Sequence, residues 1–315
     1  MQTTQFKHAE LMNHTDKLVE IFVRCDDFYK HFEKFLQAKA IQEPMVKPAA
    51  GDKCRLSQSE IMTIVIFYHV SGFKCFKYYY EQGMLKTWKS YFPDAVSYNR
   101  FIEVKKRSEY GLVLLHSLPW TGYSTGNYFI DSTKMPVCDN HRIHSHKVFR
   151  DVAARGKTST GWFYGLKLHL IINEQGELMS VCFTGGNVSD NNGAVVQRLC
   201  QALDQGAKIF ADAGYVSQKL FEALYEQGWQ LITKIRRNMK NKLLLLKDKF
   251  MLKRRSLIET VINLLKCWLD LWHTRHRSVD NAFNNMLACL AAYSFLDKKP
   301  CIKQKLTPFA IDYNR

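Results

Sequence analysis

The sequence has no apolar run long enough to cross a membrane, no Cys-x-x-Cys motif, no internal repeat and no low-complexity tract. Its longest apolar runs, Ile61–Phe67 and Met286–Tyr293, fall far short of the roughly 20 residues that a transmembrane helix requires. The segment Met1–His14 is polar and lacks the apolar stretch of a secretory signal. The nine cysteines are scattered and odd in number, which is typical of reduced thiols. We therefore expect a cytoplasmic protein with no membrane partner.

Acidic residues are scarce relative to basic ones. The 315 residues include 45 Lys and Arg but 29 Asp and Glu, which gives a formal net charge of +16. Apolar residues make up 46% and charged residues 23%, so the composition is that of a globular chain and not of a disordered one. An excess of positive charge favours a polyanionic partner, because neutralising phosphates releases counterions. The charge therefore indicates nucleic acid, with a basic protein of unrelated function as the alternative.

Residues 1–122 have the pattern of a mostly helical domain. Ser57, followed three residues later by Glu60, is a capping-box signal that predicts a helix over Ile61–Val70. Apolar residues at helical spacing before residue 40, and a further stretch at Tyr98–Leu118, predict more helices. The segment Glu43–Lys53 contains two prolines and a glycine and is expected to be a loop.

Residues 123–298 change to short strands alternating with helices, in the order β-β-β-α-β-α-β-α. Gln175-Gly176 predicts a hairpin turn, and Asp190 is a plausible helix N-cap. This order predicts an α/β domain with a sheet flanked by helices, and residues 299–315 form a tail. The expected strands are Asn127–Ser132, Trp162–Asn173, Leu178–Thr184, Ala207–Ala211 and Gln230–Ile235, and the expected helices are Ala194–Leu203, Gln218–Gln227 and Arg254–His273.

Two of the expected strands end in an aspartate, which small residues follow. Asp131 stands in the run FIDST and Asp212 in the run FADAG. Ligands and catalytic groups gather at the carboxyl ends of strands in open α/β sheets, so this pair is a candidate metal site. The alternative is that each aspartate caps a turn.

A third carboxylate stands on the long helix expected at Arg254–His273. Arg255, Glu259 and Lys266 fall on one narrow face at about 100° per residue, with an apolar arc opposite that can pack on a sheet. A surface stripe with an i,i+4 ion pair is the alternative interpretation. In-line attack on a phosphodiester uses two Mg²⁺ ions about 4 Å apart, and such ions take carboxylate oxygens. Arg255 and Lys266 are candidates for holding phosphates beside this site.

The run Arg255-x3-Glu259-x6-Lys266 resembles the third motif of bacterial insertion-sequence DDE transposases, written Y-(2)-R-(3)-E-(6)-K, with Leu252 at the tyrosine position. Tyr128–Ser132 and Phe210–Tyr215 resemble the first and second motifs. Four further stretches most resemble the insertion-sequence family numbered nine-eighty-two: His146–Phe149, Arg155–Lys157, Gly161–His169 and Gly185–Val188. The resemblance is clear over residues 128–266 and weaker in the helical part.

This resemblance implies an RNase H-like catalytic domain with Asp131, Asp212 and Glu259 as ligands of two Mg²⁺ ions, which Mn²⁺ can replace. It implies a bacterial, nucleoid-associated enzyme that binds the terminal inverted repeats of its element, frees a 3′-hydroxyl and joins it to target DNA, and it suggests a homodimer. The helical residues 1–122 are expected to bind the DNA ends. The expected DNA-contacting residues are Arg255, Lys266, Arg155, Lys157, His146, Lys147, Arg236 and Arg237.

Other candidates leave alternatives open. The loop with Cys138, His141, His144 and His146 has metal-ligating residue types, but its spacing matches no standard finger, so a phosphate-contacting loop is preferred to a zinc site. The aromatic run at 162–164 favours a core or hairpin role over stacking on a splayed base. The basic run around Arg236 and Arg237 is either a solvated loop or a DNA contact.

Two further competing carboxylates, Asp139 and Asp151, do not end an expected strand and rank below Asp131. Two other functions also fit the sequence. One is an RNase H-like nuclease that cuts without joining, and the other is a catalytically inactive DNA-binding protein. The intact set of three carboxylates argues against the inactive protein.

Overall fold

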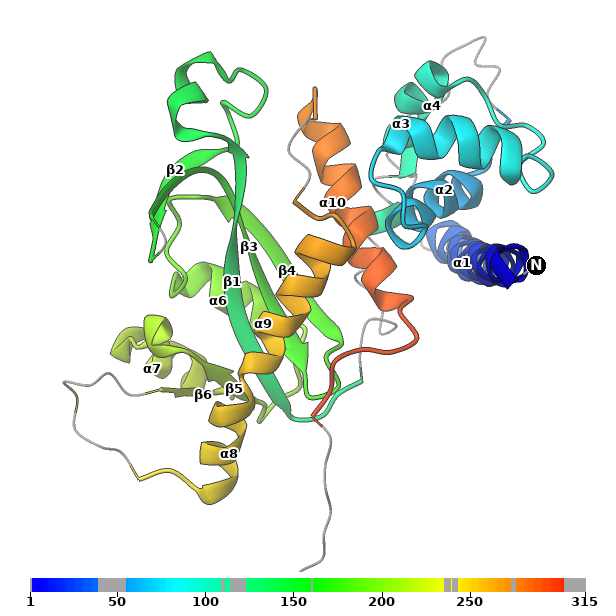
Figure 1. Ribbon diagram of the computed structural model, residues 1–315. Coiled ribbons are helices and arrows are strands. Elements are labelled where there is room, and N and C mark those ends of the chain that lie inside the picture. The colour runs from blue at the N-terminus through cyan, green and yellow to red at the C-terminus, as the bar shows by residue number, and fades with distance from the viewer. Residues whose placement is uncertain are drawn as a thin grey trace, which may run out of the picture.

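A computed structural model describes residues 2–38, 55–108, 111–113, 123–159, 161–234, 239, 243–272 and 276–302. An N-terminal group of helices packs beside a mixed α/β part with a curled six-stranded sheet (Figure 1). Within these residues no helix is both long and apolar enough to cross a membrane. The predicted loop at Glu43–Lys53 lies wholly outside the described residues, so it stays a prediction.

The N-terminal part is helical, as predicted. The capping box is present, because the Ser57 hydroxyl accepts from the Glu60 N–H at 3.1 Å and the Glu60 carboxylate accepts from the Ser57 N–H at 2.7 Å. Buried aromatic rings fill the centre of this group, with Tyr80 and Phe101 stacked at 4.6 Å between ring centroids. Its elements are α1 (Gln2–Ala38), α2 (Gln58–Val70), α3 (Phe76–Tyr78), η1 (Tyr79–Thr87), α4 (Tyr98–Val104) and η2 (Lys105–Arg107).

The sheet has the strand order β2-β3-β1-β5-β6, and β4 pairs with the same edge of β3 as β2 does. β1 is antiparallel to β3 but parallel to β5, and β5 is parallel to β6, so the sheet is mixed. The hairpin between β3 and β4 turns at Gly176, whose φ of 72° suits glycine. The strands are β1 (Asn127–Cys138), β2 (Ala154–Thr158), β3 (Gly161–Asn173), β4 (Leu178–Gly185), β5 (Lys208–Ala211) and β6 (Gln230–Thr233).

Helices cover both faces of this sheet (Figure 1). One face packs against α6 (Gly193–Cys200) and α7 (Gln218–Glu226), with Ile130, Ile209 and Ala211 pointing into that core. The other face carries Phe129 and Phe210 and packs against a second set of elements. These elements are α8 (Leu246–Arg254), α9 (Ser256–Asn263), η5 (Leu264–Trp268) and α10 (Val279–Ser294).

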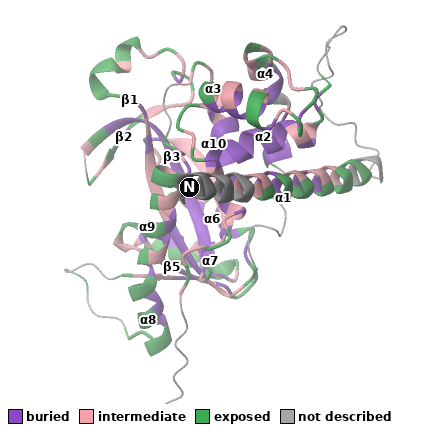
Figure 2. Ribbon diagram, turned by 45° about the vertical axis from the view of Figure 1, so that its right-hand side comes forward, coloured by how far each residue is buried: buried purple, intermediate pink, exposed green. Residues whose placement is uncertain are grey.

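Helix α10 is buried on two sides and joins the N-terminal helices to the sheet. Leu287, Ala288 and Ala291 belong to the core of the N-terminal helices, whereas Leu290 and Tyr293 belong to the core beneath the sheet. Figure 2 shows α10 buried between α2 and the strands. The predicted boundary between residues 122 and 123 therefore separates two segments whose hydrophobic cores are both completed by α10.

Several elements differ from the sequence-based expectations. β1 does not end at Ser132 but continues to Cys138, so Asp131 lies within the strand. The strand β2 and the helices α8 and α10 were not predicted. The helix expected over Arg254–His273 is broken by a turn at Arg255 and changes to π-helical geometry from Leu264.

Candidate active site

Asp131 lies within β1, and Asp212 directly follows the adjacent parallel strand β5. The register of β1 and β5 pairs Phe129 with Phe210, and continuing it by two residues brings Asp131 opposite Asp212. Both side chains therefore share the sheet face that carries Phe129 and Phe210, and strand neighbours in a sheet lie about 4.8 Å apart. Asp212 also caps the short helix η4 (Ala213–Tyr215), accepting from the Gly214 N–H at 2.8 Å. The alternative interpretation, that the aspartate caps a turn, is thus also correct for Asp212.

Glu259 is connected to this pair through Arg255. The Arg255 Nη1 donates to Oδ2 of Asp131 at 3.0 Å, and its Nη2 donates to Oε1 of Glu259 one helical turn further along α9. The Arg255 side chain is 11% exposed and that of Glu259 is 55% exposed. The i,i+4 ion pair predicted for the surface therefore exists, but its arginine is buried against the sheet.

Burial raises the pKa of the Asp131 carboxyl to about 6. The Arg255 guanidinium and the Ser132 N–H lower this pKa, whereas the negative charge of Asp212 raises it further. Two carboxylates side by side at a sheet edge disfavour each other's ionisation, and a cation between them relieves that cost. Arg255 supplies one positive charge here.

The donor set fits a hard divalent cation, because it consists of carboxylate oxygens from the neighbouring strands β1 and β5. Asp131 and Asp212 would hold such an ion, with Glu259 reached across Arg255. In the part of the chain that the structure describes, however, no three His, Cys, Asp or Glu side chains are gathered closely enough to hold a metal ion. The third carboxylate is thus adjacent to the pair and joined to it by an arginine.

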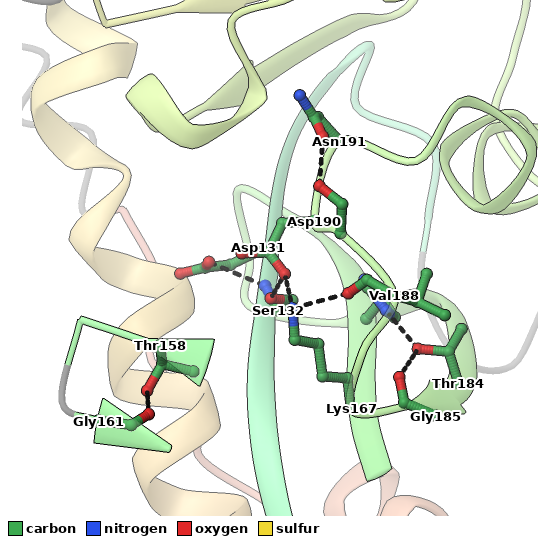
Figure 3. A network of polar contacts seen from close by, with 12 residues as sticks. Asp131, Ser132, Thr158, Gly161, Lys167, Thr184, Gly185, Val188, Asp190 and Asn191 are labelled. Carbon is green, nitrogen blue, oxygen red and sulfur yellow. Dashed lines mark hydrogen bonds and ion pairs between the residues drawn. The ribbon is translucent and has the colours of Figure 1, made fainter. Parts of the chain in front are cut away.

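A second polar cluster lies on the opposite face of the sheet, directly behind Asp131 (Figure 3). Asp190 accepts from the Ser132 hydroxyl at 2.6 Å and from the Lys167 ammonium at 2.8 Å. Burial opposes ionisation of Asp190, but the hydrogen bonds from Lys167 and Ser132 lower its pKa below the ordinary value. Asp190 was predicted to cap a helix, and this is wrong because Asn192 caps α6.

The sequence prediction missed Lys167 and Ser132, although β3 carried a signal for the lysine. Lys167 and His169 alternate with Leu166, Leu168 and Leu170, which places two polar side chains on one face of a buried strand. Such buried polar groups need partners. His169 has one in the Thr184 hydroxyl at 2.9 Å, and burial lowers its pKa to about 4.

Lys266, in the π-helical segment η5, lies over an aromatic ring. Its Nζ is 4.3 Å from the ring centroid of Trp272. Burial, together with the neighbouring Lys134 ammonium, lowers the pKa of Lys266 to about 8. Trp268, expected on the packed arc, is 75% exposed.

The β2–β3 hairpin presents an aromatic ring between two cations. The Arg155 guanidinium lies 5.0 Å and the Lys157 ammonium 5.6 Å from the ring of Trp162, which is 52% exposed. Phe163 and Tyr164 are buried, as expected for core or hairpin residues.

Of the remaining predicted contacts, His146 stacks on Phe149 at 5.7 Å and Lys147 is exposed. Arg236 and Arg237 lie outside the described residues. The zinc alternative at the loop of Cys138 and His146 finds no support among the described residues, which contain no cluster of three metal-ligating side chains. The competing carboxylates Asp139 and Asp151 are exposed.

No curated protein matches the chain. Among solved structures, it is similar to a piggyBac transposase in a synaptic complex with hairpin DNA, with 10% identity and a TM-score of 0.38. That match covers 55% of this chain and 46% of the piggyBac chain, so this chain spans less than half of its length. A family model described as "Transposase DDE domain" matches residues 121–279, which is half of the chain. The chain therefore belongs to the family of proteins with a transposase DDE domain.

Proposed function

We propose that this protein is the DNA transposase of an insertion sequence of the family numbered nine-eighty-two, with an RNase H-like catalytic domain at residues 123–298. Asp131, Asp212 and Glu259 are its catalytic carboxylates. The observation that carries the proposal is the register of β1 and β5, which points Asp131 towards Asp212 when it is extended by two residues, together with the Arg255 side chain that bridges Asp131 and Glu259. The match to the family over residues 121–279 supports it.

Two Mg²⁺ ions, which Mn²⁺ can replace, would be held by these carboxylates, and when bound they neutralise the scissile phosphate and activate the attacking hydroxyl or water. The chain's own groups prepare the site. The Ser132 N–H holds one oxygen of Asp131 at 2.8 Å, while Arg255 holds the other. The buried Arg255 also brings a permanent positive charge to the place where phosphate arrives.

Terminal inverted repeats and target DNA are the proposed partners, and the net charge of +16 supports a polyanionic ligand. Residues 1–122 bind the DNA ends, two copies bridge the two ends as a homodimer, and residues 299–315 form the tail. The proposed phosphate and base contacts are Arg155, Lys157, His146, Lys147, Arg255, Lys266, Arg236 and Arg237.

The experiment measures Mg²⁺-dependent cleavage and joining of a duplex that carries the terminal inverted repeat flanking this coding sequence. Asp212→Asn and Glu259→Gln each remove one charge while nearly keeping the side-chain shape. Both are expected to abolish cleavage and to retain DNA binding. Asp151→Asn is the matched control, because it removes a carboxylate that is exposed and lies apart from the cluster.

Each other outcome assigns a different function. Cleavage that survives in Asp212→Asn or Glu259→Gln removes that residue from the catalytic set. Cleavage without joined product identifies a nuclease. A wild-type protein that binds the duplex and never cuts it in Mg²⁺ or Mn²⁺ is a DNA-binding protein without catalysis.

A further inference from the structure

Ser132 contacts a carboxylate on each side of the sheet (Figure 3). Its main-chain N–H donates to Oδ1 of Asp131 at 2.8 Å. Its hydroxyl donates to Oδ1 of Asp190 at 2.6 Å. One residue therefore links the candidate catalytic aspartate to a charge on the opposite face.

Asp190 is a fixed anchor for that hydroxyl. The Lys167 ammonium donates to Oδ1 of Asp190 at 2.8 Å and to the carbonyl oxygen of Val188 at 2.8 Å. The Lys167 side chain is 8% exposed and belongs to β3, which pairs with β1. The segment that joins β4 to α6 is thus fastened to the sheet through Asp190.

The strand register makes this contact specific to the position after Asp131. Ser132 pairs with His169 across β1 and β3, and Lys167 lies two residues further along the same face of β3. The anchor therefore acts on the backbone next to Asp131, where a small rotation of the peptide would swing the carboxylate out of line with Asp212.

We propose that Ser132 is a positioning residue, which the Lys167–Asp190 pair locks in place so that Asp131 is held ready to bind a divalent cation together with Asp212. The proposal rests on the proposed function, because it assigns the cation site to Asp131 and Asp212. Groups that orient metal ligands through hydrogen bonds commonly change metal affinity by about 10- to 100-fold when they are removed.

The test measures binding of Mn²⁺ alone to the full-length protein, by electron paramagnetic resonance of the free ion, and the Mn²⁺ concentration for half-maximal DNA cleavage. Ser132→Ala removes the hydroxyl, while Lys167 still neutralises Asp190, so the fold is kept. For Ser132→Ala we expect the dissociation constant of Mn²⁺ and the Mn²⁺ concentration for half-maximal cleavage each to rise about tenfold or more. Its thermal stability in chelator should be close to that of the wild type. Ser132→Thr, which keeps a hydroxyl, is expected to restore tight binding.

Thr184→Val is the matched control. It removes a hydroxyl that bonds His169 and the Gly185 carbonyl, next to the same cluster, without touching Asp190 or Asp131. If Ser132→Ala binds Mn²⁺ as tightly as both the wild type and the Thr184→Val control do, the positioning role of Ser132 is overturned. The proposed metal site would not be affected by that result. A wild-type protein that binds no Mn²⁺, or an Asp212→Asn variant that binds it unchanged, overturns the proposed metal site and the positioning role with it.

Discussion

Arg255, at the turn between α8 and α9, donates from Nη1 to Oδ2 of Asp131 on β1 at 3.0 Å. The same guanidinium reaches Glu259 through Nη2. Arginine is always protonated in proteins, so this positive charge is present at every working pH. Its planar fork can serve two carboxylates at once, which the single ammonium of lysine cannot do in the same geometry. The residue therefore docks α9 on the sheet and sets the spacing of two candidate catalytic groups.

The first prediction concerns this fork. Arg255→Lys keeps the charge but loses one of the two contacts, so we expect DNA cleavage to fall at least tenfold and the free energy of unfolding to fall by about 1–3 kcal/mol. Cleavage rates and urea denaturation measure both effects. Arg254→Lys is the control, because Arg254 is exposed and stacks on Phe250 instead. Wild-type cleavage by Arg255→Lys would contradict the assigned role.

The second prediction uses the pKa of Asp131, which lies near 6 in the folded protein against an ordinary 3.8. Because the pKa of Asp131 is higher in the folded state, the folded protein binds this proton more tightly than the unfolded chain does. The protonated Asp131 therefore stabilises the folded state fully below pH 4, and this contribution is lost as the pH rises through about 6. The unfolding free energy of the wild type relative to Asp131→Asn should therefore fall by on the order of 3 kcal/mol between pH 4 and 7. Urea denaturation in chelator measures this difference. A difference that is the same at both pH values contradicts it.

Local sequence patterns predicted much of the fold. The capping box of Ser57 and Glu60, the turn at Gly176 and the strand at 208–211 depend on neighbours within a few residues, and all are confirmed. A rule about strand ends singled out Asp131 and Asp212, but only Asp212 directly follows its strand, whereas Asp131 lies within β1. The family match supports the resemblance to DDE transposases.

Long-range contacts explain what the sequence did not reveal. Lys134 and Pro136 interrupt the apolar pattern after Asp131, yet β1 continues because β3 pairs with it through Tyr164, and the register shifts next to the proline, which has no N–H to donate. The break at Arg255 coincides with an ion pair to a residue more than a hundred positions away. Asp190 was assigned to the nearest helix, but its partners lie on β1 and β3.

The third prediction concerns the hairpin ring and its cations. Trp162→Ala removes a surface on which a base can stack, and should weaken binding to single-stranded DNA by about five- to a hundredfold. Lys157→Ala removes one phosphate contact, and should weaken binding to all sequences and reduce the salt slope by about one. Affinity at several salt concentrations separates the two effects. Lys219→Ala is the control, since Lys219 is exposed and lies on α7, away from the hairpin. If Lys219→Ala changed the salt slope as much as Lys157→Ala does, a specific phosphate contact by Lys157 would be contradicted.

The last prediction concerns helix α10, which completes the core of the N-terminal helices with Leu287, Ala288 and Ala291. A fragment of residues 1–122 lacks these side chains, and it also lacks Asn284, whose amide donates to the Lys105 carbonyl at 3.1 Å. We expect this fragment to melt without a cooperative transition, and the full chain with Leu290→Ala to lose about 2–5 kcal/mol in a single transition. Circular dichroism during heating and urea titration measures both. A fragment that melts cooperatively would make residues 1–122 an independent domain, and two separate transitions in the full chain would show that α10 does not couple the two parts.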